Sequence, residues 1–242
     1  MVKLTIDGRE IEAEAGTMVR TAARNNNIYI PGLCDEEAVA PYGACRLCIV
    51  EITTAGGRER LVTSCLYPVE EGLVVRANTE RVLRNRRMLI ELLLARCPDS
   101  WTVQAQAREL GVEGNRLTPQ EGHNRCILCS LCARVCREVV GVSAISLANR
   151  GVNRQLSTPF NLDFSEACIG CGSCSYICPT GAIRMKDTGA KRVVKWPHAE
   201  MEFKMKQCPV CGRYWAPEKQ VEYIARISGV KPEELNVCQE CR

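Results

Sequence analysis

The sequence predicts an α+β protein made of several small domains, each organised around a set of cysteines. Three observations support this prediction. The chain has 242 residues, yet aromatic residues make up only 5% of it, so aromatic burial does not organise the whole chain. Cysteine is abundant, with 17 residues. Strand-like alternation and helix-like periodicity also follow one another along the chain, as expected for an α+β protein.

Sixteen of the seventeen cysteines fall into four sets of four, and Cys97 is left over. Four thiolates are what one tetrahedral metal ion or one iron–sulfur cluster requires. The N-terminus lacks the apolar run of a signal peptide, so we expect a cytoplasmic protein with reduced thiols and metal sites in place of disulfides. The four sets are Cys34, Cys45, Cys48 and Cys65; Cys126, Cys129, Cys132 and Cys136; Cys168, Cys171, Cys174 and Cys178; and Cys208, Cys211, Cys238 and Cys241.

Charge and hydropathy exclude two further classes of protein. The formal net charge is +4. Metal ligation deprotonates thiols, so four four-thiolate sites would bring the net charge to about −4. The composition therefore does not point to nucleic-acid binding. We also expect no membrane span, because no apolar stretch approaches the ~20 residues that a span needs.

Residues 1–78 are predicted to form a small half-open sheet packed on one helix. Val2, Leu4 and Ile6 alternate with polar residues, and Asp7-Gly8 is a hairpin signal. A return strand follows, and Thr17 is the expected N-cap of a helix at residues 18–24. Further strands are expected at residues 47–53, 61–64 and 73–75. Cys34, Cys45 and Cys48 lie in the segments that lead into the first of these strands, and Cys65 follows the second.

Residues 79–118 are predicted to be a helical connector. Thr79 is the expected N-cap of a helix over residues 79–96, whose apolar residues lie broadly on one face. Arg81, Arg84 and Arg87 line another face. We interpret this stripe as solvated, with a docking surface for a partner subunit as the alternative.

Residues 119–186 contain two C-x2-C-x2-C-x3-C runs, CILCSLCARVC and CIGCGSCSYICP. In the bacterial two-cluster pattern, the first three cysteines of each run hold one cluster and the fourth crosses to the other. Two zinc knuckles would not need the x3-C spacing. His123 is interpreted as a surface histidine, with a hydrogen bond to a cluster as the alternative. The spacing therefore predicts one [4Fe–4S] cluster on Cys126, Cys129, Cys132 and Cys178, and a second on Cys168, Cys171, Cys174 and Cys136.

The C-terminal part is predicted to be a linker, residues 187–200, followed by a four-cysteine knuckle, residues 201–242. CPVCG and CQEC supply two C-x2-C corners, the usual form of a closed structural zinc site. A rubredoxin-like mononuclear iron is the alternative. Between the corners we expect a helix over residues 217–228, with Val221, Ile224 and Ile227 on one face. No basic stripe accompanies the knuckle, so a DNA-binding zinc ribbon is not favoured.

The sequence shows no dinucleotide-binding G-x-G-x-x-G after a strand and no phosphate-binding G-x-x-x-x-G-K-[ST]. It contains only two histidines for general acid–base chemistry. We therefore predict a chain that carries single electrons and depends on partners at both ends to start and finish a two-electron reaction.

These motifs resemble a known family. Residues 1–78 resemble a plant-type [2Fe–2S] ferredoxin domain with a β-grasp fold, in the variant found at the N-terminus of the complex I large iron–sulfur subunit. GACRLCIVEI, CLYPVEEGLVV, HNRCILCSLCARVC and CIGCGSCSYICPTGAI resemble the small iron–sulfur, or diaphorase, subunit of NAD-linked [NiFe]-hydrogenases. The four-cysteine extension is similar to the tail of ferredoxin-type subunits in formate hydrogenlyase-like complexes.

The resemblance implies one [2Fe–2S] cluster on Cys34, Cys45, Cys48 and Cys65, and a relay between a flavin/NAD(H)-binding subunit and a hydrogenase. Electron bifurcation with free ferredoxin is a further expectation. The same relay in an NAD-linked formate dehydrogenase, or a non-redox zinc-binding adaptor, are the alternatives. The family also has a cluster held by one histidine and three cysteines. Residues 96–103 offer only Cys97, so we predict that this cluster is absent.

Overall fold

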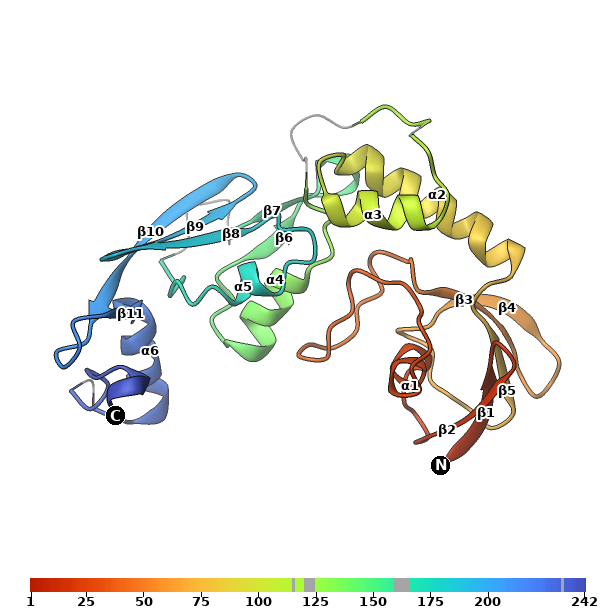
Figure 1. Cartoon of the computed structure of the whole chain (residues 1–242), viewed down its shortest axis with the longest axis horizontal. Coiled ribbons are helices and arrows are strands. Elements are labelled where there is room, and N and C mark those ends of the chain that lie inside the picture. The colour runs from red at the N-terminus through yellow and green to blue at the C-terminus, as the bar shows by residue number, and fades with distance from the viewer. Residues whose placement is uncertain (115, 120–124, 159–165, 232) are drawn as a thin grey trace. The chain divides into compact units, whose positions relative to one another are not determined.

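The structure, a computed structural model, describes residues 1–114, 116–119, 125–158, 166–231 and 233–242. The chain divides into two compact units, Met1–Cys129 and Ser130–Arg242, each with helices and sheet of its own (Figure 1). No helix within the described ranges has the length and hydrophobicity that crossing a bilayer demands. His123 lies outside the described residues, so its interpretation stays a prediction.

The first unit contains a five-stranded sheet in the order β2-β1-β5-β3-β4. Strands β1 and β5 run parallel, and the other neighbours are antiparallel. Asp7 and Gly8 have φ values of 47° and 81°, as the tight turn between β1 and β2 requires, which confirms the predicted hairpin. The strands are β1 (Val2–Ile6), β2 (Arg9–Ala13), β3 (Ile49–Thr53), β4 (Glu59–Thr63) and β5 (Leu73–Arg76).

Helix α1 (Val19–Asn25) packs its buried residues against this sheet. The prediction of Thr17 as its N-cap is wrong: Met18 holds that position, and no side chain caps the helix. The first turn has other hydrogen-bond acceptors instead. Val19 N–H donates to the Tyr67 carbonyl at 2.8 Å, and Arg20 N–H donates to a carbonyl in the turn after β4 at 3.0 Å. Neighbouring backbone therefore replaces the side-chain cap.

Helix α2 (Glu80–Arg96) begins as predicted, because the Thr79 side chain accepts a hydrogen bond from Val82 N–H at 3.2 Å. A second helix, α3 (Trp101–Glu109), follows it. Two arginines of the predicted stripe form ion pairs. Arg81 pairs with Glu51 at 3.0 Å, and Arg87 pairs with Glu80 at 3.4 Å. Arg81 and Arg87 therefore have ion-pair partners within the chain, whereas Arg84 is exposed.

The second unit begins with α4 (Leu131–Arg134), which continues directly into a π-helical turn, Val135–Val139. The short strands β6 (Ser146–Ala148) and β7 (Gln155–Ser157) pair antiparallel. Helix α5 (Ser173–Tyr176) lies within the second cysteine run. These short elements position the cysteines of both runs that belong to this unit.

The predicted linker at residues 187–200 is wrong, because this segment forms part of a four-stranded antiparallel sheet. The charged residues, glycine and proline of this segment are typical of a linker. Val194 and Trp196 are nevertheless buried in the core of the unit, together with Phe203 of the next strand. The sheet order is β11-β10-β9-β8, with β8 (Arg184–Thr188), β9 (Lys191–Trp196), β10 (Ala199–Gln207) and β11 (Tyr214–Pro217).

Helix α6 (Glu218–Ser228) confirms the helix expected between the two C-terminal cysteine corners. Its predicted apolar face is only partly right. Val221 is buried, but Ile224 and Ile227 are 39% and 64% exposed. Ala225, one turn after Val221, takes the buried position instead.

Candidate metal centres

The first four predicted ligands come together in the first unit, and all four are buried. Cys34 and Cys45 lie in the long segment between α1 and β3, Cys48 precedes β3 directly, and Cys65 follows β4. The sulfurs of Cys48 and Cys65 are 3.4 Å apart. The thiols of Cys34 and Cys45 are also hydrogen-bonded to each other. The site therefore consists of two neighbouring thiol pairs.

Backbone amides point at these sulfurs. Leu33 N–H donates to Cys45 Sγ and Cys45 N–H donates to Cys34 Sγ, both at 3.3 Å. Arg46 has a φ of 62°, which turns the chain sharply between Cys45 and Cys48. Amides aimed at sulfur stabilise the negative charge that cluster ligation places there. The local backbone thus fits a thiolate-bound cluster.

The electrostatics of the two pairs favour a cation at their centre. The hydrogen bond between Cys48 and Cys65 lowers the pKa of Cys48 to about 6. The corresponding bond raises the pKa of Cys65, and a bond to Cys34 raises that of Cys45. Four buried thiols this close do not all ionise unless positive charge compensates them. Iron would supply that charge, so the residues fit a [2Fe–2S] cluster.

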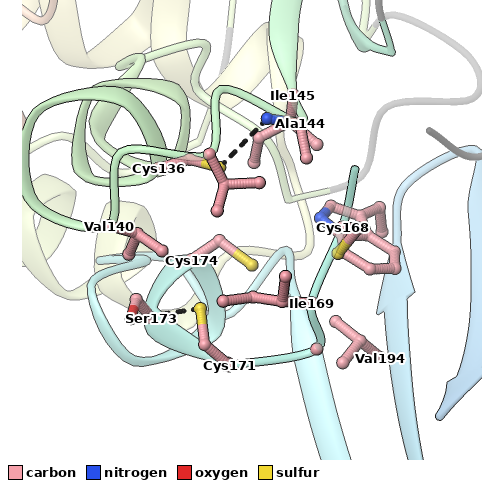
Figure 2. A pocket seen from close by; sticks show the side chains of 14 residues that line it. Cys136, Val140, Ala144, Ile145, Cys168, Ile169, Cys171, Ser173, Cys174 and Val194 are labelled. Atoms are coloured by element: carbon pink, nitrogen blue, oxygen red, sulfur yellow. Dashed lines mark hydrogen bonds between the residues drawn. The ribbon is translucent and has the colours of Figure 1, made fainter. Parts of the chain in front are cut away.

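One pocket of the second unit contains Cys136, Cys168, Cys171 and Cys174 in its lining (Figure 2). Cys136 belongs to the π-helical turn after α4, whereas the other three belong to the loop before α5 and to α5 itself. The fourth cysteine of the first run therefore faces the first three of the second run. The cysteine spacing assigned these same four residues to one [4Fe–4S] cluster. The rest of the lining is mainly apolar, and includes Ile145, Ile169, Val194 and Trp196.

Burial raises the pKa of two of the pocket thiols, to about 11 for Cys168 and about 12 for Cys174. Burial also raises the pKa of Cys136, although its sulfur accepts a hydrogen bond from Ala144 N–H at 3.3 Å. Without metal these thiols are protonated at neutral pH. Metal ligation would displace the protons and provide the charge that stabilises the thiolates. The pocket therefore fits an enclosed cluster.

The hairpin that replaces the predicted linker holds the loop between Cys168 and Cys171. Arg192 on β9 donates to the Gly170 carbonyl at 3.1 Å and forms a two-pronged ion pair with Asp187 at 2.7 and 2.8 Å. Gly170 has a φ of 70°, and a Cβ there would lie 2.6 Å from the Phe203 ring. The hydrogen bond from Arg192 and the close packing of Gly170 against Phe203 together fix the loop. No local signal pointed to Arg192, because a charged stretch with turn residues is typical of a linker.

We expect Arg192→Gln to loosen this loop. The change removes charge-assisted hydrogen bonds, so local opening should become easier by about 2 kcal/mol, equivalent to roughly 30-fold faster amide exchange. Hydrogen-exchange mass spectrometry of residues 168–174 measures this. Lys195→Gln is the matched control, because Lys195 on the same strand forms an exposed ion pair at 3.4 Å. Equal exchange rates in the two variants would contradict the role of Arg192.

The remaining set of the two runs stays a prediction from the sequence. Cys126 and Cys129 belong to the first unit, and Cys132 and Cys178 to the second. Within the second unit, Cys132 and Cys178 pack against the same apolar core as the pocket cysteines.

Cys97, the cysteine left over from the four sets, is fully buried, and its thiol donates to the Leu93 carbonyl at 2.8 Å. Burial raises its pKa to about 12, and the negative charge of the nearby Cys126 adds to the shift. The Cys97 thiol is therefore held by a backbone carbonyl of the helix that precedes it.

The C-terminal cysteines form a tight group. The four sulfurs of Cys208, Cys211, Cys238 and Cys241 all lie within 4.8 Å of one another. The Cys211 and Cys238 sulfurs are 3.8 Å apart, which equals the edge of a tetrahedron with metal–sulfur bonds of about 2.3 Å. Backbone amides of Cys238 and Cys211 lower the pKa of Cys208 to about 6. The group therefore fits one tetrahedral metal ion.

Cys238→Ser tests this group. Cys238 is buried and its N–H donates to Cys208 Sγ at 3.5 Å, so the change removes a ligand from the centre of the knuckle. We expect the loss of about one bound metal ion per chain and protease sensitivity confined to residues 208–242, because a closed four-thiolate site holds its fold through the metal. Elemental analysis and limited proteolysis measure both effects. Full metal retention would contradict the assignment.

Comparisons with known proteins identify iron–sulfur domains in two parts of the chain. Residues 1–80 match the model of the 2Fe-2S iron-sulfur cluster binding domain, and residues 164–184 match that of the 4Fe-4S binding domain. The chain is 35% identical to NADPH-Fe(3+) oxidoreductase subunit alpha of Geobacter sulfurreducens, over 77% of this chain and 24% of that protein. It is 29% identical to the mitochondrial NADH-ubiquinone oxidoreductase 78 kDa subunit of Candida albicans, over 76% of this chain and 28% of that protein. The chain thus spans about a quarter of the length of these curated relatives.

The chain is also similar to most of one chain in a solved structure. A chain of NAD+-reducing [NiFe]-hydrogenase in the H2-reduced state matches with a TM-score of 0.56 and 31% identity, covering 65% of this chain and 74% of that chain. These matches confirm the resemblance that the cysteine motifs indicated. The protein belongs to the family of iron–sulfur subunits that includes this chain of NAD+-reducing [NiFe]-hydrogenase, and it is related to the 78 kDa subunit of NADH-ubiquinone oxidoreductase.

Proposed function

We propose that this chain is an electron-transfer subunit that relays electrons between a flavin/NAD(H)-binding subunit and a [NiFe]-hydrogenase. The observation that carries the proposal is the pocket shared by Cys136 and three cysteines of the other run. Crossed ligation of this kind places two clusters close together, which suits electron transfer more than structural support. The similarity to a chain of NAD+-reducing [NiFe]-hydrogenase supports the choice of partners.

The proposed cofactors are one [2Fe–2S] cluster, two [4Fe–4S] clusters and one zinc ion. The clusters would supply centres that gain and lose single electrons. The parallel pairing of β1 and β5 beside α1 supports a β-grasp domain for the first cluster. The chain's own contribution is to bury the sulfurs, direct amides at them and hold their loops. The proposed ligands of the [2Fe–2S] cluster are Cys34, Cys45, Cys48 and Cys65; those of the [4Fe–4S] clusters are Cys126, Cys129, Cys132 and Cys178, and Cys136, Cys168, Cys171 and Cys174.

Zinc is the metal that we assign to Cys208, Cys211, Cys238 and Cys241, with mononuclear iron as the alternative. The four sulfurs lie within 4.8 Å of one another, so protein sulfurs would take all four positions around a tetrahedral ion. Such a closed site has no position for a substrate, so its role is structural. The ion would hold together the two segments that precede and follow α6.

Partner identity is tested by purifying the tagged full-length chain without oxygen from cells that express it natively. We expect a flavin- and NAD(H)-binding subunit and a hydrogenase in equal amounts, in an assembly that reduces NAD+ with H2. Recovery of a formate dehydrogenase would support that relay instead. Reduction of added ferredoxin alongside NAD+ would support bifurcation. Recovery of the chain alone, or with non-redox proteins, would contradict the proposal.

A further inference from the structure

Arg86 is the most deeply buried charged side chain in the described part of the chain, at 2% exposure. It lies on α2, outside the cysteine motifs. Its guanidinium group donates from Nε to the Leu47 carbonyl at 3.0 Å and from Nη2 to the Ile49 carbonyl at 2.7 Å. These two carbonyls flank Cys48, so the arginine fixes the backbone on both sides of one proposed cluster ligand.

The charge of Arg86 is not neutralised by an ion pair with any described residue, in contrast to Arg192, which pairs with Asp187. Burial lowers the pKa of Arg86. Among nearby acidic groups, Cys48 opposes that shift most, ahead of Asp7, and Tyr29 and Glu109 contribute less. A guanidinium group remains charged in a protein even when buried. A cation therefore lies against the backbone that carries Cys48, with little solvent to screen it.

We propose that Arg86 is a positioning residue of the [2Fe–2S] site, which holds the Cys48 loop through two carbonyls and favours the reduced cluster by its positive charge. The inference rests on the proposed ligation by Cys34, Cys45, Cys48 and Cys65. One-electron reduction adds one negative charge to the site, and a fixed cation nearby stabilises that charge. The arginine thus raises the reduction potential of the cluster.

Two substitutions at Arg86 separate the effect of its charge from the effect of its two hydrogen bonds. The planar guanidinium group reaches both carbonyls at once, whereas lysine would keep the charge but present a single ammonium group. Glutamine would keep one hydrogen-bond donor group and remove the charge. Arg84, two residues away on the same helix, is exposed, so Arg84→Gln is a matched control for the loss of one positive charge from α2.

The test is a redox titration of the full chain with dithionite, followed by EPR of the [2Fe–2S] signal. For Arg86→Gln we expect the equilibrium constant for reduction to fall about tenfold, equivalent to a midpoint lower by about 59 mV for a one-electron couple. Arg86→Lys should lie between this variant and the wild type, with altered g values because the loop is held differently. Arg84→Gln should match the wild type.

Midpoints and g values in both Arg86 variants equal to those of Arg84→Gln would overturn the inference. If Arg86→Gln does not retain the cluster, Arg86→Lys decides: a lowered midpoint or altered g values support the inference, and an unchanged or raised midpoint with unchanged g values overturns it. A wild-type chain without any [2Fe–2S] signal would instead overturn the proposed ligation, so the two failures are distinguishable.

Discussion

Cys45→Ser is expected to abolish the [2Fe–2S] signal in low-temperature EPR and to leave the [4Fe–4S] signals intact. Cys45 is buried, contacts Cys34, and accepts a hydrogen bond from Leu33 N–H, so its sulfur lies at the centre of the proposed site. Serine is a poor ligand for iron in a site built for thiolates. The other proposed clusters do not use Cys45, so their signals should persist.

The same variant also tests the relay. In the purified assembly, Cys45→Ser should stop H2-dependent reduction of NAD+ while H2 oxidation with an artificial dye continues, because only the path through this chain is interrupted. Cys97→Ser is the control, since Cys97 is equally buried but is not assigned to any cluster. An unchanged EPR spectrum in Cys45→Ser would refute the ligand assignment. Unchanged NAD+ reduction without the [2Fe–2S] signal would refute its place in the relay.

Cys136→Ser is the second change with a large expected effect, because it tests the crossed ligation. Cys136 belongs to the first run by sequence but lines the pocket with Cys168, Cys171 and Cys174. We therefore expect the loss of one [4Fe–4S] cluster, about four iron ions per chain, with the other cluster and the [2Fe–2S] signal retained. Iron analysis together with EPR spin quantification measures this result.

Comparison with Cys171→Ser sharpens the test. If both cysteines hold one cluster, the two single variants and the double variant should all lose the same amount of iron. If each run held its own cluster, the double variant would lose twice as much iron as either single variant. That additive loss would contradict the crossed assignment.

The sequence predicted most elements whose signals are local. The β1–β2 hairpin follows from alternating apolar residues and the Asp7-Gly8 turn, and α2 begins at its Thr79 cap. The cysteine spacing placed Cys136 with the second run before any fold was known, and the pocket brings these residues together. Close spacing in the chain also predicted the C-terminal group of four sulfurs.

The features that the sequence did not predict depend on tertiary contacts. Thr17 is a good cap residue, but carbonyls from distant backbone made a cap unnecessary. In the sequence Arg192 is typical of a solvated charge, and only the fold brings it into contact with Asp187 and the Gly170 carbonyl. Arg86 is one of several arginines on α2, and only the packing of the helix against the Cys48 loop shows which one turns inward.

Three of the four thiol sets are proposed to hold iron and sulfide. The most direct measurement is the quantification of iron, acid-labile sulfide and zinc in the full chain purified without oxygen. We expect a brown protein with about ten iron ions, about ten sulfides and one zinc ion per chain. A colourless protein with no labile sulfide and about four zinc ions would contradict it and would identify a zinc-binding adaptor.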